Sequence, residues 1–404
     1  MEFNLKNKIN FFISKSKSLF FKISKGNGNS ILRPNMPELD FLRGVAILVV
    51  VLYHGFYWII INYYDLSVFN GLGKIIILST AGGWLGVHLF FVLSGFLITG
   101  ILLDTKERPD YFKRFYSRRA LRILPAYLAL LCILLILGAI QWPFLVISVF
   151  FLSNLAVLFG LSVQYAPLWT LAIEEQFYLF WPQAVRRLSK KALTILALSV
   201  VVLTTILRLI AVLSGQRQGL TIYTWFLTDG FTMGSLMAIY LRSKYATRKK
   251  VLHMGLILVA VGLSIMAVGA PFGILTHKTT FGSIFQFVPW YFVFAGTILL
   301  FLIVGTSHLK RFVLWNWLRY FGYISYGLYL IHFFIFTELD LLAQKLSPAL
   351  SIFIHTTASG LVLRFIIGAG MSILIAALSR KYFESFFLNL RNKNNPVLKT
   401  NLNK

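Results

Sequence analysis

Long apolar stretches recur along almost the whole length of this sequence. Each is close to the roughly 20 residues that a helix needs to cross the hydrocarbon core of a bilayer. The short alternating segments of an outer-membrane barrel do not occur. The eleven candidate segments are 40–62, 83–103, 120–140, 143–160, 168–185, 192–213, 221–241, 251–270, 287–306, 321–342 and 352–378. With 58% hydrophobic and only 13% charged residues, the sequence predicts an all-α, polytopic membrane protein.

Lysine and arginine gather in the tails and in short loops between these segments, although the net charge is +26. Loops rich in these residues stay on the cytoplasmic side. If the basic loops 104–119 and 186–191 both lie inside, one of the segments 143–160 and 168–185 cannot cross fully. We expect the shorter one, 143–160, to be re-entrant or interfacial. That leaves about ten transmembrane helices, both termini in the cytoplasm, and no surface suited to nucleic acid.

The chain is expected to consist of one membrane domain with a basic tail at each end. We place the membrane domain at 37–385 and basic cytoplasmic tails at 1–36 and 386–404. The first tail interleaves phenylalanine with lysine, which suits either an interfacial segment or a disordered tail. The single cysteine, Cys132, excludes a disulfide within the chain and a cysteine metal site, and no metal is expected.

The first apolar segment carries two ionisable residues, Arg43 and His54. Eleven positions make almost three helical turns, so both side chains share one face, roughly 16 Å apart along the axis. Ionisable residues at membrane depth are costly and mark functional pathways by default. The structural alternative is an arginine at the cytoplasmic edge and a hydrogen-bonded core histidine.

A group of arginines crowds the start of the third segment, among them Arg118, Arg119 and Arg122. Arg119 and Arg122 are spaced to share a helical face. Such a group can be a topology signal or a contact for lipid headgroups. Arginine forks also bind phosphates well, so a phosphate-bearing ligand is the functional interpretation.

The segment at 168–185 contains two adjacent acids, Glu174 and Glu175. Carboxylates at membrane depth face a partner or a water-filled cavity. Consecutive helical side chains point about 100° apart, so we expect one glutamate to be functional and the other to pair structurally. The predicted topology places both at a depth similar to that of His54.

Further polar residues lie within apolar segments. Ser94 adjoins Gly95 and could serve helix packing, and His332 could be a core histidine. Ser94, His332 and Tyr326 are also candidates for lining the cavity that the glutamates would face. His88 is expected to be a packing residue. Arg208 and Arg364 have no role that spacing can assign.

Five motifs in this order together resemble the membrane-bound acyltransferase 3 family. They are LDFLRGVAILVVVLYH at 39–54, GVHLFFVLSGFLI at 86–98, RRALRILPAY at 118–127, LWTLAIEEQFYLFWP at 168–182 and ISYGLYLIH at 324–332. The resemblance covers about residues 37 to 385. Thr170 stands where the family often has Ser, and His88 where Asp is common. A proline that usually follows the late histidine closely is missing. The chain resembles a stand-alone member without an extracellular hydrolase-like domain.

The resemblance implies transfer of an acyl group, acetyl in the first instance, from cytoplasmic acyl-CoA to a hydroxyl of a surface or lipid-linked glycan. The protein would then lie in a bacterial cytoplasmic membrane. Arg43, Arg118, Arg119 and Arg122 would hold the donor phosphates. His54 would be the base, oriented by Glu175 or Glu174.

Three alternatives stay open at this point. An acyl-enzyme relay would use the same residues. A transporter or exporter also fits many helices with intramembrane charges, but it would predict a repeat that the sequence does not show. A lipid-linked-sugar glycosyltransferase or polymerase would be expected to contain more acidic residues than the thirteen present.

Overall fold

The computed structural model describes residues 31–33, 35–309 and 315–393. These residues form helices joined by short turns and contain no strand, which confirms the predicted all-α class. Most of the tail predicted at 1–36 lies outside the described residues. The tail predicted at 386–404 begins within the last helix and leaves the described residues after Lys393.

Short 3₁₀ or π turns, labelled η, lie between some of the helices. The first half contains α2 (Pro37–Leu52), η1 (Tyr53–Tyr57), α3 (Trp58–Tyr63), η2 (Leu66–Val68), α4 (Gly71–Ser79), η3 (Ala81–Trp84), α5 (Leu85–Asp104), α6 (Tyr111–Ile136), α7 (Trp142–Val149), η4 (Ser153–Phe159) and α8 (Leu168–Arg187). The second half contains α9 (Lys190–Leu213), η5 (Thr224–Phe226), α10 (Thr228–Leu241), α11 (Arg248–Gly269), η6 (Ala270–Phe272), α12 (Thr280–Phe285), α13 (Phe287–Leu309), α14 (Trp315–Leu346), α15 (Pro348–Thr356), α16 (Ala358–Leu378), η7 (Ser379–Glu384) and α17 (Ser385–Lys393).

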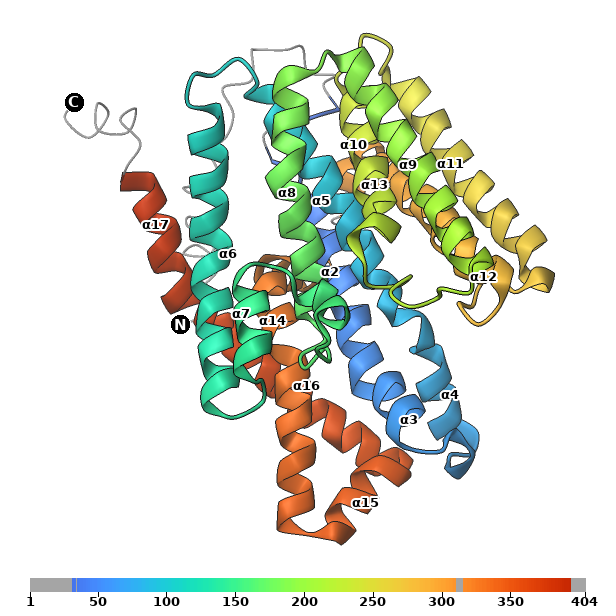
Figure 1. Cartoon of the computed structure of the whole chain (residues 1–404), viewed down its shortest axis with the longest axis vertical. Coiled ribbons are helices and arrows are strands. Elements are labelled where there is room, and N and C mark those ends of the chain that lie inside the picture. The colour runs from blue at the N-terminus through green and yellow to red at the C-terminus, as the bar shows by residue number, and fades with distance from the viewer. Residues whose placement is uncertain (1–30, 34, 310–314, 394–404) are drawn as a thin grey trace.

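Eight helical stretches in the described part of the chain are long and apolar enough to cross a membrane. They are Pro37–Tyr63, Gly71–Asp104, Tyr111–Ile136, Lys190–Leu213, Arg248–Phe272, Phe287–Val304, Trp315–Leu346 and Ala358–Leu390. The glutamate-bearing α8 and the 14-residue α10 are not among them, yet both pack against α5 (Figure 1). The number of about ten crossings and the orientation of the termini therefore stay predictions.

The segment at 143–160 is the irregular one, as expected. It forms the eight-residue α7 and the short turn η4, whereas α8 is one continuous 20-residue helix. Pro143 suits the first turn of α7 because a helix start leaves backbone N–H groups unpaired in any case. After α7, Phe151 takes a φ of 55°, which ends the helix.

The last predicted segment, 352–378, is wrong as a single helix. It is divided at Thr357 between α15 and α16. The Thr357 side chain accepts a hydrogen bond from the backbone N–H of Gly360 and so caps the start of α16. A capping residue marks the start of a new helix without lowering the hydropathy of the segment, so hydropathy alone does not reveal this break.

Glycines let the central helices approach at backbone distance. A Cβ at Gly44 of α2 would lie 1.8 Å from the carbonyl oxygen of Leu318, and one at Gly322 of α14 would lie 1.8 Å from that of Asp40. Small residues commonly permit such contacts between membrane helices. This pairing places the face of α2 that carries Gly44 against α14.

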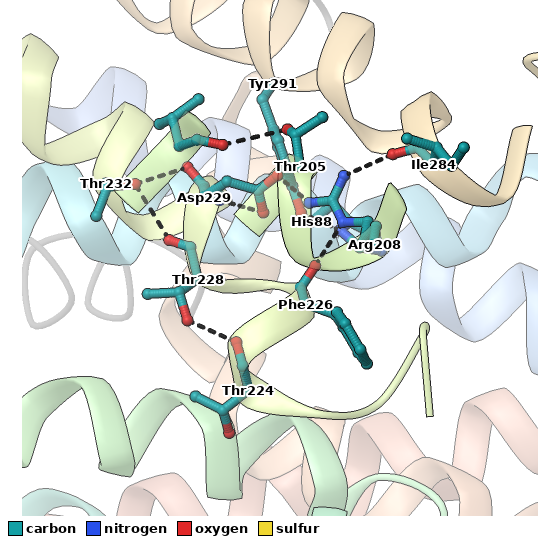
Figure 2. A network of polar contacts seen from close by, with 12 residues as sticks. His88, Thr205, Arg208, Thr224, Phe226, Thr228, Asp229, Thr232, Ile284 and Tyr291 are labelled. Carbon is teal, nitrogen blue, oxygen red and sulfur yellow. Dashed lines mark hydrogen bonds and ion pairs between the residues drawn. The ribbon is translucent and has the colours of Figure 1, made fainter. Parts of the chain in front are cut away.

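A buried polar network joins α9, α10, α12 and α13 to α5 (Figure 2). Arg208 is fully buried, pairs with the Asp229 carboxylate and donates to the carbonyl oxygens of Phe226 and Ile284. His88 hydrogen-bonds the Tyr291 hydroxyl through Nδ1 at 2.9 Å. The network links these helices to one another, and His88 has the structural role expected from the sequence.

Candidate functional site

A cavity lies among α2, α5, α6, α8 and α14. Its empty volume is about 750 Å³, which includes open space at its mouth. Its lining combines apolar side chains with charged and hydroxyl groups. The lining residues are Arg43, Val87, Phe90, Phe91, Ser94, Leu97, Arg119, Arg122, Ile123, Thr170, Leu171, Glu174, Ser325, Tyr326 and Tyr329. A pocket of this composition is the default place to look for ligand binding.

The cavity brings together three of the four arginines that the sequence suggests as phosphate ligands. Arg43, Arg119 and Arg122 all line it, and Arg122 is exposed there. Arg122 also lies within electrostatic range of Arg380 in η7, which sequence reasoning did not select. Arg118 does not line the cavity, because consecutive residues of a helix point about 100° apart.

The positive charge of this cluster is only partly compensated. Arg43 has a loose contact, with Nη1 3.5 Å from Oδ1 of Asp40. Neither Arg119 nor Arg122 forms an ion pair within 4 Å of a described carboxylate. Arg119 instead packs its guanidinium over the Tyr178 ring, 4.3 Å from the centroid. Free guanidinium groups at an open cavity suit a phosphate-bearing ligand.

The two adjacent glutamates have different surroundings. Glu174 lines the cavity, and its Oε1 accepts hydrogen bonds from the Ser94 hydroxyl at 2.5 Å and from the Tyr178 hydroxyl. Glu175 is not in the lining, and its buried Oε1 has no hydrogen-bond partner in the described part of the chain. It does lie within electrostatic range of Arg119. Ser94, a packing candidate from sequence, is thus also a cavity residue.

His54 and His332 form a hydrogen-bonded pair, with Nε2 of His332 3.2 Å from Nδ1 of His54. Nδ1 of His332 faces two carbonyl oxygens, those of Leu328 and Tyr329, so it carries the hydrogen. Nε2 of His332 is then the acceptor. The single hydrogen on Nδ1 of His54 is shared between it and the Val50 carbonyl oxygen, which lies 3.0 Å away.

This tautomer leaves Nε2 of His54 as the basic nitrogen. It makes no hydrogen bond within the described part of the chain. No hydrogen bond joins Glu174 or Glu175 to this imidazole in the described part of the chain, where His332 is its side-chain partner. The orienting role of a glutamate stays a prediction. Glu174 hydrogen-bonds Ser94 and Tyr178 instead, and Glu175 lies within electrostatic range of Arg119.

Neither histidine lines the cavity, and Tyr329 connects the two features. Tyr329 lines the cavity, and its carbonyl oxygen lies 2.8 Å from Nδ1 of His332. Ser325, Tyr329 and His332 follow one face of α14 at spacings of four and three residues. The histidine pair therefore lies on the continuation of a cavity wall.

Hydroxyl groups complete that wall. The Thr170 hydroxyl donates to the Pro167 carbonyl and lies 2.6 Å from the Tyr329 hydroxyl, which donates to it. Tyr326 lines the cavity and donates to the Ile123 carbonyl at 2.8 Å. Sequence reasoning selected Tyr326 but missed Tyr329, whose spacing of three residues from His332 was an available signal.

Comparisons with known proteins agree with the motif pattern. A family model described as an acyltransferase domain matches residues 36–381. The peptidoglycan O-acetyltransferase OatA of Listeria monocytogenes is 25% identical over 393 residues, which cover 87% of this chain and 56% of the relative. O-acetyltransferase OatA of Staphylococcus aureus is 34% identical over 166 residues, 36% of this chain and 24% of the relative.

A putative peptidoglycan O-acetyltransferase of Bacillus subtilis, YrhL, is 34% identical over 172 residues, covering 36% of this chain and 23% of the relative. The chain thus spans about half or less of the length of the curated relatives it matches. No solved structure shows significant similarity to it.

Proposed function

Because the chain belongs to the membrane-bound acyltransferase 3 family, we propose that it transfers an acyl group from acyl-CoA to a hydroxyl of a cell-envelope glycan. The simplest donor is acetyl-CoA, supplied from the cytoplasm across a bacterial cytoplasmic membrane. Two of the relatives are named as peptidoglycan O-acetyltransferases, that of Bacillus subtilis as a putative one, and these names support O-acyl transfer to a glycan.

The observation that carries the proposal is the cavity that begins at arginines whose charge is only partly compensated and ends beside a histidine pair. Arg43, Arg119 and Arg122 would take the phosphates of the donor by charge-assisted hydrogen bonds. From Arg43 to His54 the helix rises roughly 16 Å, comparable to the reach of an extended pantetheine arm. The thioester would then lie near Tyr329 and the histidines.

In the reaction, the acceptor hydroxyl attacks the thioester carbonyl carbon while Nε2 of His54 takes its proton. The carbon–sulfur bond breaks, coenzyme A leaves as the thiolate, and the proton passes from His54 to the sulfur. The products are the O-acyl ester and free coenzyme A. His332 has the role that an acid has in hydrolytic triads, because it fixes the tautomer of the base.

A transporter or exporter is the second class considered for this chain. Arginines in an open cavity would also suit passage of an anion. The two classes differ in one readout, because only an acyltransferase consumes acyl-CoA and releases the free thiol.

The test uses the purified protein in lipid nanodiscs with radiolabelled acetyl-CoA and a soluble glycan acceptor. His54→Ala is expected to lower the rate of thiol release and label transfer by roughly 10²- to 10⁴-fold, the usual contribution of a general base. His253→Ala, an exposed histidine on α11, is the matched control and should keep the rate. Wild-type transfer by His54→Ala would refute the assignment of the base.

A further inference from the structure

Arg364 on α16 is a buried arginine that contacts the turn carrying His54. Its side chain is 1% exposed. Nη1 donates to the carbonyl oxygen of Gly55 at 2.7 Å. Nε and Nη2 donate to the two oxygens of Asp340 on α14, at 2.5 Å and 2.7 Å. One guanidinium thus joins three elements, η1, α14 and α16.

The arginine is itself firmly placed. The fork of two parallel hydrogen bonds to Asp340 sets the plane of the guanidinium. Its Cζ lies 4.9 Å over the ring of Phe336. Asp340 receives a further contact from Nε2 of His355 at 3.1 Å, and His355 is stacked on Tyr64 at 4.6 Å. With these neighbours, Arg364 has little freedom to leave Gly55.

The element it contacts is unusual. η1 is a π-helical turn between α2 and α3, and it includes both His54 and Gly55. Single π turns inside α-helices occur frequently at functional sites. α16 packs directly on this turn, because a Cβ at Gly55 would lie 2.5 Å from the ring of Phe365. The missing side chain lets α16 approach, and Arg364 bonds the backbone there.

The α14 helix therefore holds η1 at two points. His332 contacts His54 directly, and Asp340 contacts Gly55 through Arg364. The two α14 residues are eight positions apart, roughly 12 Å along the helix. We infer that Arg364 and Asp340 are positioning residues that fix η1 so that Nδ1 of His54 stays on Nε2 of His332. This inference rests on the proposed function, in which His54 is the base.

Such a restraint matters because the rate of proton transfer is sensitive to the geometry of the reacting groups. A displacement of about 1 Å at a reacting group can cost on the order of 10²-fold in rate. A π turn contains one residue more than the α-helical turn that it replaces. It can therefore revert to regular α-helix unless another element restrains it. Arg364 supplies that restraint from α16.

The test measures the kcat of acyl transfer and the KM for acyl-CoA for Arg364→Lys and Asp340→Asn. Lysine keeps the charge but loses the fork, and asparagine keeps the shape but loses the carboxylate. Both variants are expected to lower kcat by about tenfold or more, which lies within the rate loss that a misplaced base causes. The KM for acyl-CoA should change by less than about twofold. An unchanged kcat in either folded variant overturns the inference.

A double-mutant cycle separates positioning from general weakening of the protein. If Arg364 acts through the histidine pair, Arg364→Lys should have little further effect on kcat in a His332→Ala background. Full multiplication of the two effects would overturn the inference. If Arg364→Lys does not fold, the same cycle is run with Asp340→Asn.

The matched control is the other buried arginine–aspartate pair, Arg208 and Asp229 (Figure 2). Arg208→Lys and Asp229→Asn should lower thermal stability but keep kcat per folded molecule. If the Arg364 variants behave in the same way, their role is structural only. An inactive His54→Ala together with fully active Arg364 variants would refute the positioning inference but not the base assignment. An active His54→Ala would refute the base assignment, and the positioning inference with it.

Discussion

Nε2 of His332 lies 3.2 Å from Nδ1 of His54, although 278 positions separate the two residues along the chain. The contact exists because glycines bring α2 and α14 to backbone distance. It distinguishes the two nitrogens of His54, since Nδ1 contacts His332 and Nε2 makes no hydrogen bond in the described part of the chain. In the proposed reaction, this contact orients His54 as the base.

His332→Ala removes the partner that fixes the tautomer of His54. We expect kcat to fall by roughly 10- to 100-fold, the usual effect of removing a residue that hydrogen-bonds a functional histidine. The loss should be smaller than in His54→Ala. The KM for acyl-CoA should change little, because His332 does not line the cavity. Steady-state kinetics of thiol release would show this split. A loss confined to KM would contradict it.

Arg122→Ala removes an exposed guanidinium from the cavity. A hydrogen bond to a charged group contributes about 1.5–3 kcal/mol, so the affinity for coenzyme A should fall by at least about tenfold. Calorimetric titration with coenzyme A measures it. Arg187→Ala, an exposed arginine at the end of α8, is the control with unchanged affinity. Equal affinities in all three proteins would exclude a phosphate site here.

Glu174→Gln and Glu175→Gln make a matched pair of substitutions with opposite expected effects on stability. The amide introduced by Glu174→Gln would offer only a neutral acceptor to Ser94 and Tyr178, so a cost of about 1 kcal/mol is expected. Glu175→Gln removes charge from a carboxylate whose buried Oε1 has no partner among the described residues, and should be neutral or stabilising. Thermal unfolding in detergent ranks the two. The reverse order would show that their surroundings differ from those described.

Gly322→Ala tests the approach of α2 and α14. Its Cβ would lie 1.8 Å from the Asp40 carbonyl oxygen, so the helices must separate, at a cost of typically 1–3 kcal/mol or more. The histidine pair should loosen and kcat should fall as well. Gly370→Ala on α16 is the control, because no described atom lies within 4 Å of its added Cβ. A fully active, stable Gly322→Ala protein would disprove the close packing.

The class of fold and most of the candidate residues could be predicted from local patterns. Apolar runs near bilayer length predict helices because every backbone group must be paired inside lipid. The helical period predicts Arg43 and His54 on one face, although only Arg43 lines the cavity, and arginine chemistry marks Arg119 and Arg122. These inferences need only the residues of one segment at a time, and the structure brings the three arginines into one cavity.

What the sequence determined by itself is therefore the all-helical class and the chemical types along its apolar segments. Only the tertiary structure decided the partners: His332 rather than a glutamate for His54, Ser94 and Tyr178 for Glu174, and Gly55 with Asp340 for Arg364. The reason is that such contacts depend on how each helix is rotated and how closely its neighbour approaches. Small residues and capping groups set both, and neither leaves a signal in hydropathy.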